Sequence, residues 1–133
     1  MIFCDTSAFI MVIDAAQPKH ALAAQKWQEL VKERALVVSS SYVVAEAVSV
    51  LQARVGLQAV SDFHERIYPL LHVEWIDAPT HEAAMESLLT ASRRKLSLVD
   101  CTSFIVMRRL GISQVFAFDP HFAEQGFEVV PRQ

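Results

Sequence analysis

Five short apolar runs alternate along the chain with segments of helical periodicity, and this alternation restricts the fold more than any other feature. The runs cover residues 1–5, 36–39, 73–76, 115–118 and 127–130. Short continuous apolar runs are typical of strands buried on both faces, as in parallel sheets covered by helices. The pattern therefore predicts an α/β fold in three layers, with a central, mostly parallel five-stranded sheet flanked by helices.

Helices are expected between these strands, and local end signals set several of their limits. The expected helices cover residues 18–34, 57–71 and 80–94, and another begins near residue 42. Thr80 is expected to cap the helix over 80–94. Ser97 stands three residues before Asp100, the spacing of a capping box, and the helix that it opens is expected to end at Gly111.

The length and composition fit one ordinary domain, which we expect to span residues 1–133, because no repeat or linker interrupts the pattern. Trp27 and Trp75 are expected in its core. No run of about 18 apolar residues occurs, and no basic region precedes an N-terminal apolar segment as in a secretory signal. The two cysteines, Cys4 and Cys101, suit a reducing compartment. We therefore expect a cytoplasmic protein without a membrane segment.

Four acidic residues, Asp5, Glu46, Asp100 and Asp119, stand isolated in otherwise apolar sequence. Burying an unpaired carboxylate costs several kcal/mol or more, so each needs a compensating partner. Asp5 and Asp119 end the first and fourth expected strands. If the strand order is 3-2-1-4-5, these two strands flank the point where the order reverses, which is where open parallel sheets bind ligands. Glu46 and Asp100 lie near the starts of two helices that can face the same cleft.

Carboxylates grouped in this way are hard oxygen ligands, which suit Mg²⁺ or Mn²⁺ better than zinc. The chemistry natural to such a cluster is metal-assisted attack of water on a phosphodiester. Taken singly, Asp100 is explained as a helix N-terminal acid and Asp119 as a turn residue before Pro120. It is the combination of four that favours a metal pocket. The net charge of −3 does not exclude a nucleic acid, because acids that hold cations do not repel its phosphates.

Several other residues are candidates for weaker roles near this cluster. The basic run Arg93, Arg94 and Lys95 offers contacts to substrate phosphates, although solvated residues at a helix end explain such a run equally well. His121 stands close to Asp119 and is able to approach a phosphate, but a histidine in a surface turn is the simpler interpretation.

The segments DTSAFI near the N-terminus, SLVDCTSF and FAFDPHF, together with the isolated helical Glu46, resemble a PIN-domain nuclease. They are most similar to the VapC-type toxins of bacterial toxin–antitoxin pairs. The resemblance extends over nearly the whole chain, from Asp5 to the C-terminal FEVV. It rests on four spaced acids in order, since none of the segments is specific alone.

This resemblance implies a three-layer PIN fold and a Mg²⁺- or Mn²⁺-dependent endoribonuclease with an RNA substrate, a cognate antitoxin and a homodimeric form. It assigns the catalytic and metal-binding roles to Asp5, Glu46, Asp100 and Asp119. It gives auxiliary polar roles to two pairs of hydroxyl residues, which are Thr6 and Ser7 beside the first acid, and Thr102 and Ser103 beside the third.

Two other functions remain open from the sequence. A response-regulator receiver domain has a similar length and an acidic pocket, and Asp77 would then be the phosphorylated residue. However, receivers carry paired acids after the first strand, where this chain has Thr6 and Ser7 after Asp5. A catalytically silent PIN module that binds RNA or protein is the other alternative, and the complete set of acids argues against it.

Overall fold

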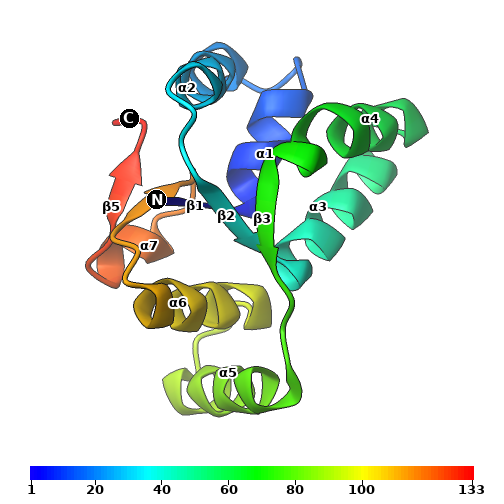
Figure 1. Ribbon diagram of the computed structural model, residues 1–133. Helices are drawn as coiled ribbons and strands as arrows, with labels where there is room; N and C mark the ends of the chain where they lie inside the picture. Colours follow the sequence, from blue (N-terminus) through cyan, green and yellow to red (C-terminus); the bar gives the residue numbers. More distant parts are fainter.

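A five-stranded sheet forms the centre of the computed structural model, which describes residues 1–133 (Figure 1). The strand order is β3-β2-β1-β4-β5 and every neighbouring pair is parallel, which confirms the predicted order. Register places Phe3 of the central strand beside Val38 on one side and Val115 on the other. The strands are β1 (Ile2–Cys4), β2 (Val37–Ser40), β3 (Leu71–Glu74), β4 (Gln114–Phe116) and β5 (Glu128–Val130).

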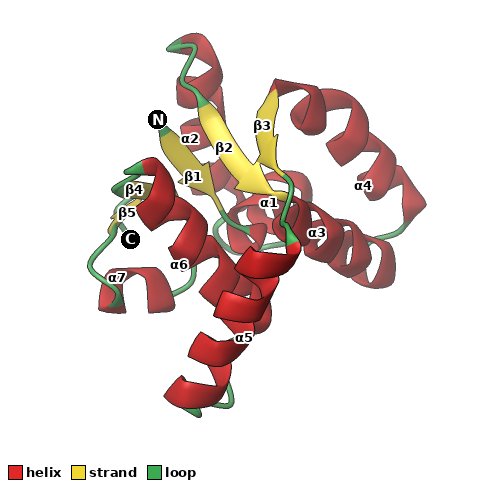
Figure 2. Ribbon diagram, turned by 60° about the horizontal axis from the view of Figure 1, so that its bottom comes forward, coloured by secondary structure: helices red, strands yellow, loops and turns green.

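Helices cover both faces of this sheet, as expected for crossover connections of one hand. The first four helices lie on one side and the last three on the other (Figures 1 and 2). None of the helices is long and apolar enough to cross a membrane. They are α1 (Thr6–Ile13), α2 (His20–Lys32), α3 (Ser41–Arg54), α4 (Leu57–Asp62), α5 (Ala78–Ala91), α6 (Leu98–Leu110) and α7 (His121–Glu124).

A single hydrophobic cluster joins the sheet to both helical layers. Phe9 of α1 meets Phe63 edge-to-face with ring centroids 5.0 Å apart. On the other side, Phe104 of α6 meets Phe122 of α7 edge-to-face at 5.2 Å. Such aromatic pairs contribute about 0.5–1.5 kcal/mol beyond the area that they bury. The core thus fixes both helical layers around the carboxyl ends of β1 and β4.

The structure corrects the sequence prediction near the N-terminus, where residues 6–13 form a helix that the pattern did not indicate. This segment reads TSAFIMVI, and its apolar residues cover the whole circumference, so no helical period is visible. The helix begins because Asp5 caps it: the Ser7 backbone N–H donates to the Asp5 side chain.

Several expected boundaries are also wrong. β3 starts at Leu71, two residues earlier than predicted, and Trp75 therefore lies beyond the strand with 73% of its surface exposed rather than in the core. Trp27 is partly buried against the core. The N-cap of α5 is Asp77 and not Thr80, because the Thr80 backbone N–H donates to the Asp77 side chain. β4 ends at Phe116, so Asp119 lies three residues past the strand rather than at its end.

The expected helix over residues 57–71 is not continuous. It divides into α4, a π-helical turn η1 (Phe63–Ile67) and a 3₁₀ turn η2 (Tyr68–Leu70), and the last of these contains Pro69. Proline has no backbone N–H to donate to the preceding turn, which is consistent with a regular helix that does not continue through Pro69.

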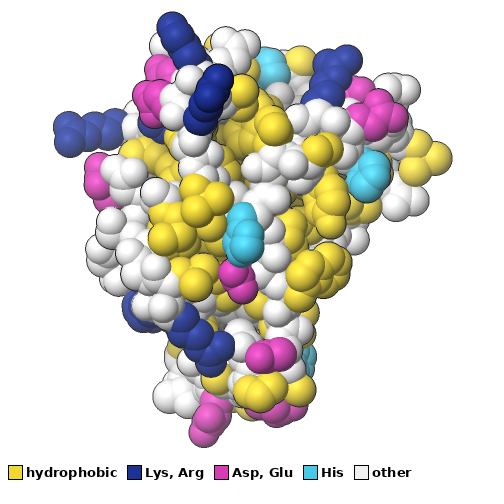
Figure 3. All heavy atoms as spheres, viewed as in Figure 1, with side chains coloured by type: hydrophobic (Ala, Val, Ile, Leu, Met, Phe, Trp, Pro, Cys, Tyr) yellow, Lys and Arg dark blue, Asp and Glu magenta, His cyan; other side chains and the backbone are white.

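Apolar side chains gather on the face that carries the β2–β3 side of the sheet (Figure 3). Leu36 and Leu70 are 52% and 53% exposed there, and Trp27, Leu30 and Val31 line a shallow groove beside them. β3 is an edge strand, so its outer backbone groups have no strand partner within the chain. This side of the molecule therefore combines exposed apolar side chains with an open strand edge.

Candidate active site

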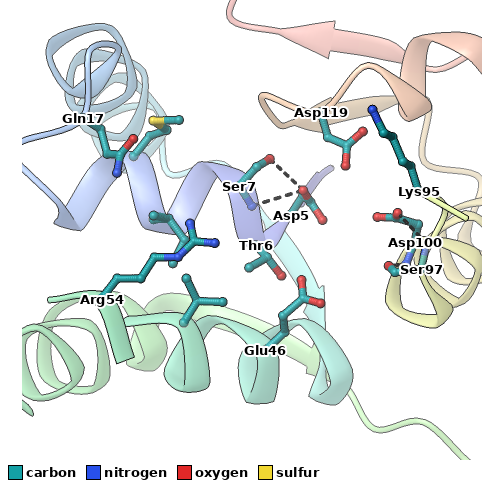
Figure 4. Close-up of a pocket in the computed structure, with 13 residues that line it drawn as sticks. Asp5, Thr6, Ser7, Gln17, Glu46, Arg54, Lys95, Ser97, Asp100 and Asp119 are labelled. Carbon is teal, nitrogen blue, oxygen red and sulfur yellow. Dashed lines mark hydrogen bonds between the residues drawn. The ribbon is translucent and has the colours of Figure 1, made fainter. Parts of the chain in front are cut away.

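A pocket of about 370 Å³ opens where the strand order reverses, between the ends of β1 and β4 (Figure 4). Residues from α1, α3, the start of α6 and the loop after β4 contribute to its walls. The structure brings all four predicted acids to this pocket, together with both predicted N-terminal hydroxyl residues. The six residues are Asp5, Thr6, Ser7, Glu46, Asp100 and Asp119.

Asp5 is the most deeply buried of the acids, with 3% of its surface exposed. Its Oδ2 accepts two hydrogen bonds from Ser7, one from the backbone N–H at 3.1 Å and one from the hydroxyl at 2.7 Å. Burial raises the pKa of Asp5 from 3.8 to about 7; the Ser7 bonds oppose this rise, and the carboxylates of Asp100 and Asp119 add to it. In the metal-free protein, the environment of this carboxyl therefore disfavours its ionised form.

Ser7 links the two sides of the sheet's central crevice. Its hydroxyl donates to Asp5 and accepts from the Phe118 backbone N–H at 2.9 Å, which ties α1 to the loop that carries Asp119. Thr6 behaves differently, because its Oγ1 is the one buried side-chain polar atom in the structure without a hydrogen-bond partner. Buried polar groups are normally paired, so this hydroxyl points to a partner that the protein itself does not supply.

Asp100 is held by the capping box that the sequence predicted. Its Oδ2 accepts from the Ser97 backbone N–H at 3.0 Å, and the Asp100 N–H donates to the Ser97 hydroxyl at 3.0 Å. The other carboxylate oxygen has no partner within the protein. Burial raises the pKa of Asp100, and the carboxylate of Asp119 raises it further. A fixed acid with one free oxygen is a suitable cation ligand.

Glu46 and Asp119 complete the acidic wall from opposite sides. Glu46 lies in the second turn of α3 and points toward the other acids (Figure 4). Asp119 accepts from the His121 backbone N–H at 2.8 Å, which orients its side chain in the loop. Asp100, Asp119 and His121 each offer a ligand atom, and these atoms lie within 4.8 Å of one another.

Other predicted residues lie away from this wall. The hydroxyls of Thr102 and Ser103 are buried and donate to carbonyls of their own helix, at Leu98 and Val99. They do not line the pocket, because the i−4 carbonyls of α6 already satisfy them.

Only one residue of the predicted basic run reaches the pocket. Lys95 lines it at the end where Asp100 and Asp119 lie (Figure 4). Arg93 is instead paired with Glu124 at 2.9 Å, and Arg94 does not contribute to the pocket wall.

Three further residues belong to the site although the sequence reasoning did not select them for it. Gln17 and Arg54 line the end of the pocket opposite Lys95. Arg54 stands eight residues after Glu46 on α3, and this spacing, two steps of four, was a usable signal for a shared face. Gln17 had no such signal, because α1 and the turn after it were not predicted. His121 was noted near Asp119 but was interpreted as a surface residue.

The donor set fits a hard divalent cation. All four acids offer oxygen, the Thr6 hydroxyl lacks a partner, and one oxygen of Asp100 is free. The carboxylates of Asp100 and Asp119 raise the pKa of Asp5, and the carboxylate of Asp119 raises the pKa of Asp100, so positive charge stabilises the ionised group. Soft cysteine ligands are absent from the pocket wall, which is consistent with Mg²⁺ or Mn²⁺ rather than zinc.

Comparison with known proteins identifies the family. The profile of the PIN domain matches residues 2–128. The chain belongs to the PIN-domain family. Among curated relatives, this PIN domain is 36% identical over 133 residues to the 23S rRNA-specific endonuclease VapC20 of Mycobacterium tuberculosis, found in two strains. The alignment covers 98% of this chain and 99% of the relative. The resemblance to VapC-type toxins seen in the sequence is thereby confirmed.

Solved structures support the same assignment. The PIN domain is similar to the crystal structure of M. tuberculosis VapC20, a sarcin–ricin loop cleaving toxin, with a TM-score of 0.85, 33% identity and 96% of each chain covered. It is also similar in fold to FitAcB from Neisseria gonorrhoeae, with a TM-score of 0.68 over 97% of this chain and 96% of that one. The second likeness, at 17% identity, concerns the fold alone.

Proposed function

We propose that this PIN domain is a metal-dependent endoribonuclease and the toxin of a toxin–antitoxin pair. The observation that carries the proposal is the convergence of four acids in one pocket where the strand order reverses, with the pKa values of Asp5 and Asp100 raised by burial and by neighbouring carboxylates. The 36% identity to a 23S rRNA-specific endonuclease supports it over nearly the full length. All of residues 1–133 act together as one nuclease domain.

The proposed roles follow from how each side chain is held. Asp5 and Asp100 are the principal metal ligands, because both are buried and fixed by hydrogen bonds. Glu46 and Asp119 complete the pocket directly or through water. When bound, Mg²⁺ or Mn²⁺ supplies positive charge that polarises the phosphate and lowers the pKa of a bound water. Ser7 keeps Asp5 oriented, and the Thr6 hydroxyl donates to a group that enters the pocket.

The substrate class is RNA, and by analogy with VapC20 we infer ribosomal RNA. Lys95 is the one cation of the predicted basic run that lines the pocket, so it is the phosphate-binding residue of that run. Its ammonium neutralises a phosphate next to the acids.

The protein partner that we infer is an antitoxin whose arginine side chain enters the acidic pocket and competes with the metal. The PIN domain acts in the cytoplasm as a homodimer, and the exposed apolar side chains at Leu36 and Leu70 support a protein contact. Light scattering of the purified chain, alone and with the partner, measures both assemblies.

The test is cleavage of ribosomal RNA, and of a short hairpin carrying the sarcin–ricin sequence, with Mg²⁺ or Mn²⁺. Wild type is compared with Asp5→Asn and Asp100→Asn, which keep the shape of each side chain and remove its charge. Cleavage by wild type, with a loss of about 100-fold or more in each variant, supports the assignment. Equal cleavage by all three proteins overturns it. Calorimetric titration with Mn²⁺ checks metal binding separately from activity.

A further inference from the structure

The pocket extends beyond the acids as a groove between α1 and α3. On the α1 side it is lined by Ile10 and Met11, one turn beyond Ser7, and on the α3 side by Val50 and Arg54, which follow Glu46 at intervals of four. Gln17 lines the same end of the pocket as Arg54 (Figure 4). Eight residues of helix span about 12 Å, so Arg54 stands well away from the acids. None of the roles proposed above involves this end of the groove.

Arg54 makes no hydrogen bond or ion pair within the protein, although acids lie in the same pocket. Figure 4 shows its guanidinium directed from α3 toward α1, on the side where Gln17 lies and opposite Lys95. As the basic residue in the last turn of α3, it also complements the helix dipole. That effect accounts for a cation at this helix end but not for its direction into the groove.

Gln17 is oriented by its neighbour, which leaves one specific atom free. Its Nε2 donates to Asp14 Oδ2 at 2.9 Å, and its own backbone N–H donates to the Asp14 carbonyl at 3.1 Å. The amide oxygen has no partner within the protein. The far end of the pocket is therefore lined by a charged donor, the Arg54 guanidinium, and by an acceptor, the Gln17 amide oxygen.

Between the acids and this end, the floor of the groove is apolar. Ile10 is buried, and Met11 and Val50 are partly buried, so the floor offers aliphatic and thioether surface. Such a surface suits the flat face of a base or the carbon side of a ribose, whereas it does not suit a second phosphate. Along the groove, the order is thus acids, apolar floor, and then a guanidinium with an amide oxygen.

We propose that this groove binds the nucleotide next to the cleaved bond, with Arg54 on its phosphate and the Gln17 amide oxygen on its ribose 2′-hydroxyl. The inference rests on the proposed ribonuclease function and deepens it. The guanidinium fixes the strand across the acids, and the 2′-hydroxyl contact favours RNA over DNA at this position. With Lys95 at the opposite end, two cations hold the strand on either side of the acidic centre.

The test uses a short RNA hairpin that wild type cleaves, in versions where each phosphate near the cut is replaced singly by a neutral methylphosphonate. One flanking replacement is expected to lower the kcat/KM of wild type by about 10- to 100-fold. The same replacement has no further effect on Arg54→Gln, because the interacting charge is already gone. Arg54→Lys recovers part of the loss, since it retains charge without the guanidinium's two-point contact.

Binding provides a second readout, measured by fluorescence anisotropy with the inactive Asp100→Asn protein as the background. Adding Arg54→Gln is expected to weaken RNA binding and to reduce the salt dependence by about one unit of log–log slope. Gln17→Leu is expected to lower the preference for RNA over an oligomer with a single 2′-deoxy nucleotide at the same position. Arg66→Gln, which removes an exposed arginine outside the pocket, is the matched control and leaves every quantity unchanged.

The possible failures are distinguishable. Absence of cleavage by wild type contradicts the ribonuclease function itself. Cleavage by wild type with Arg54→Gln indistinguishable from Arg66→Gln, and with methylphosphonate effects equal in all proteins, overturns the proposed nucleotide site alone.

Discussion

At the scale of single residues, the pocket buries polar groups that lack a partner or lie beside like charges, and such burial lowers the stability of the fold. Asp5 is buried beside two other acids, and the Thr6 hydroxyl is buried without a partner. Unsatisfied groups of this kind cost free energy in the free protein. They persist at functional sites because a ligand supplies what the chain does not.

Asp5 makes stability depend on pH in a predictable direction. The folded carboxyl keeps its proton up to a pKa of about 7, whereas the unfolded one loses it near 3.8. The folded state therefore binds more protons between these values, and its stability falls as pH rises through that window. In metal-free buffer, the free energy of unfolding of wild type, measured in urea, should fall between pH 4.5 and 7.5 by about 3 kcal/mol more than that of Asp5→Asn.

Added Mn²⁺ should reverse this loss at pH 7.5 for wild type and much less for Asp5→Asn, because the ion binds the folded state. If the free energies of unfolding of wild type and Asp5→Asn change in parallel from pH 4.5 to 7.5, the pKa of Asp5 is not raised in the folded protein.

Substitution of Thr6 is expected to lower activity without lowering stability. Thr6→Val keeps the shape of the side chain and removes a buried hydroxyl that has no partner, so the free energy of unfolding should stay constant or rise by about 1 kcal/mol. RNA cleavage should fall by roughly tenfold, the equivalent of one lost hydrogen bond. Urea unfolding and kcat/KM measured on the same preparation check both. A variant that loses stability would mean that the hydroxyl is satisfied in the folded protein.

At the scale of secondary-structure elements, caps place the acids. Asp5 begins α1 and Asp100 belongs to the capping box of α6, so two of the four acids are positioned by the same bonds that start helices. The cap of α6 and that of α5, at Asp77, allow a direct comparison, because Asp77 does not line the pocket.

Ser97→Ala should lower the free energy of unfolding by about 1 kcal/mol. It should also reduce RNA cleavage by roughly threefold to tenfold, because the first turn of α6 carries Asp100. Asp77→Ala removes the cap of α5 and should lower the thermal midpoint without changing kcat/KM. Activity that falls equally in the two variants would assign the effect to general destabilisation. Ser97→Thr is the conservative variant that restores both quantities.

Local signals explain what could be predicted from the sequence. The capping box of Ser97 and Asp100 and the buried run before Asp5 are readable from neighbouring residues alone. Alternation of strand and helix indicated a parallel sheet; its order, 3-2-1-4-5, was assumed and agrees with the structure, and the convergence of the four acids followed from that order. Convergence is a property of the topology, so it was accessible without knowledge of any contact.

The errors arose where tertiary contacts outweigh local pattern. α1 was missed because its apolar residues lie all round the helix, so the sequence shows no helical period. Trp75 was expected in the core by residue type, yet β3 begins earlier and leaves it beyond the strand. Thr102 and Ser103 match the polar neighbours of a third acid in sequence, but the helix turns their hydroxyls to its own carbonyls. None of these outcomes has a signal in adjacent residues.

At the scale of the whole molecule, the two cysteines provide a measure of global opening. Cys4 lies in the central strand and Cys101 in α6, both buried, and burial raises the pKa of each thiol. Neither should react with a thiol reagent such as DTNB in the native state, and both should react at once in urea. Native-state labelling at a rate that follows urea concentration would report unfolding of the sheet.

Fast labelling of one cysteine without denaturant would instead show that its element opens by itself. Cys4→Ala and Cys101→Ala identify which thiol reacts.

The Ser7 hydroxyl has a consequence for the order in which the protein is made. It bonds both to the first acid and to the Phe118 backbone, and Ser7 and Phe118 are 111 positions apart in the chain. During synthesis on the ribosome, the N-terminal strand appears first, but its neighbour β4 and the loop that bears Asp119 appear only after α6. A chain interrupted before this loop carries three of the four acids and cannot assemble the pocket. The proposed target of this protein is ribosomal RNA. The ribosome that makes the chain therefore does not meet an assembled pocket until the loop that bears Asp119 has been synthesised.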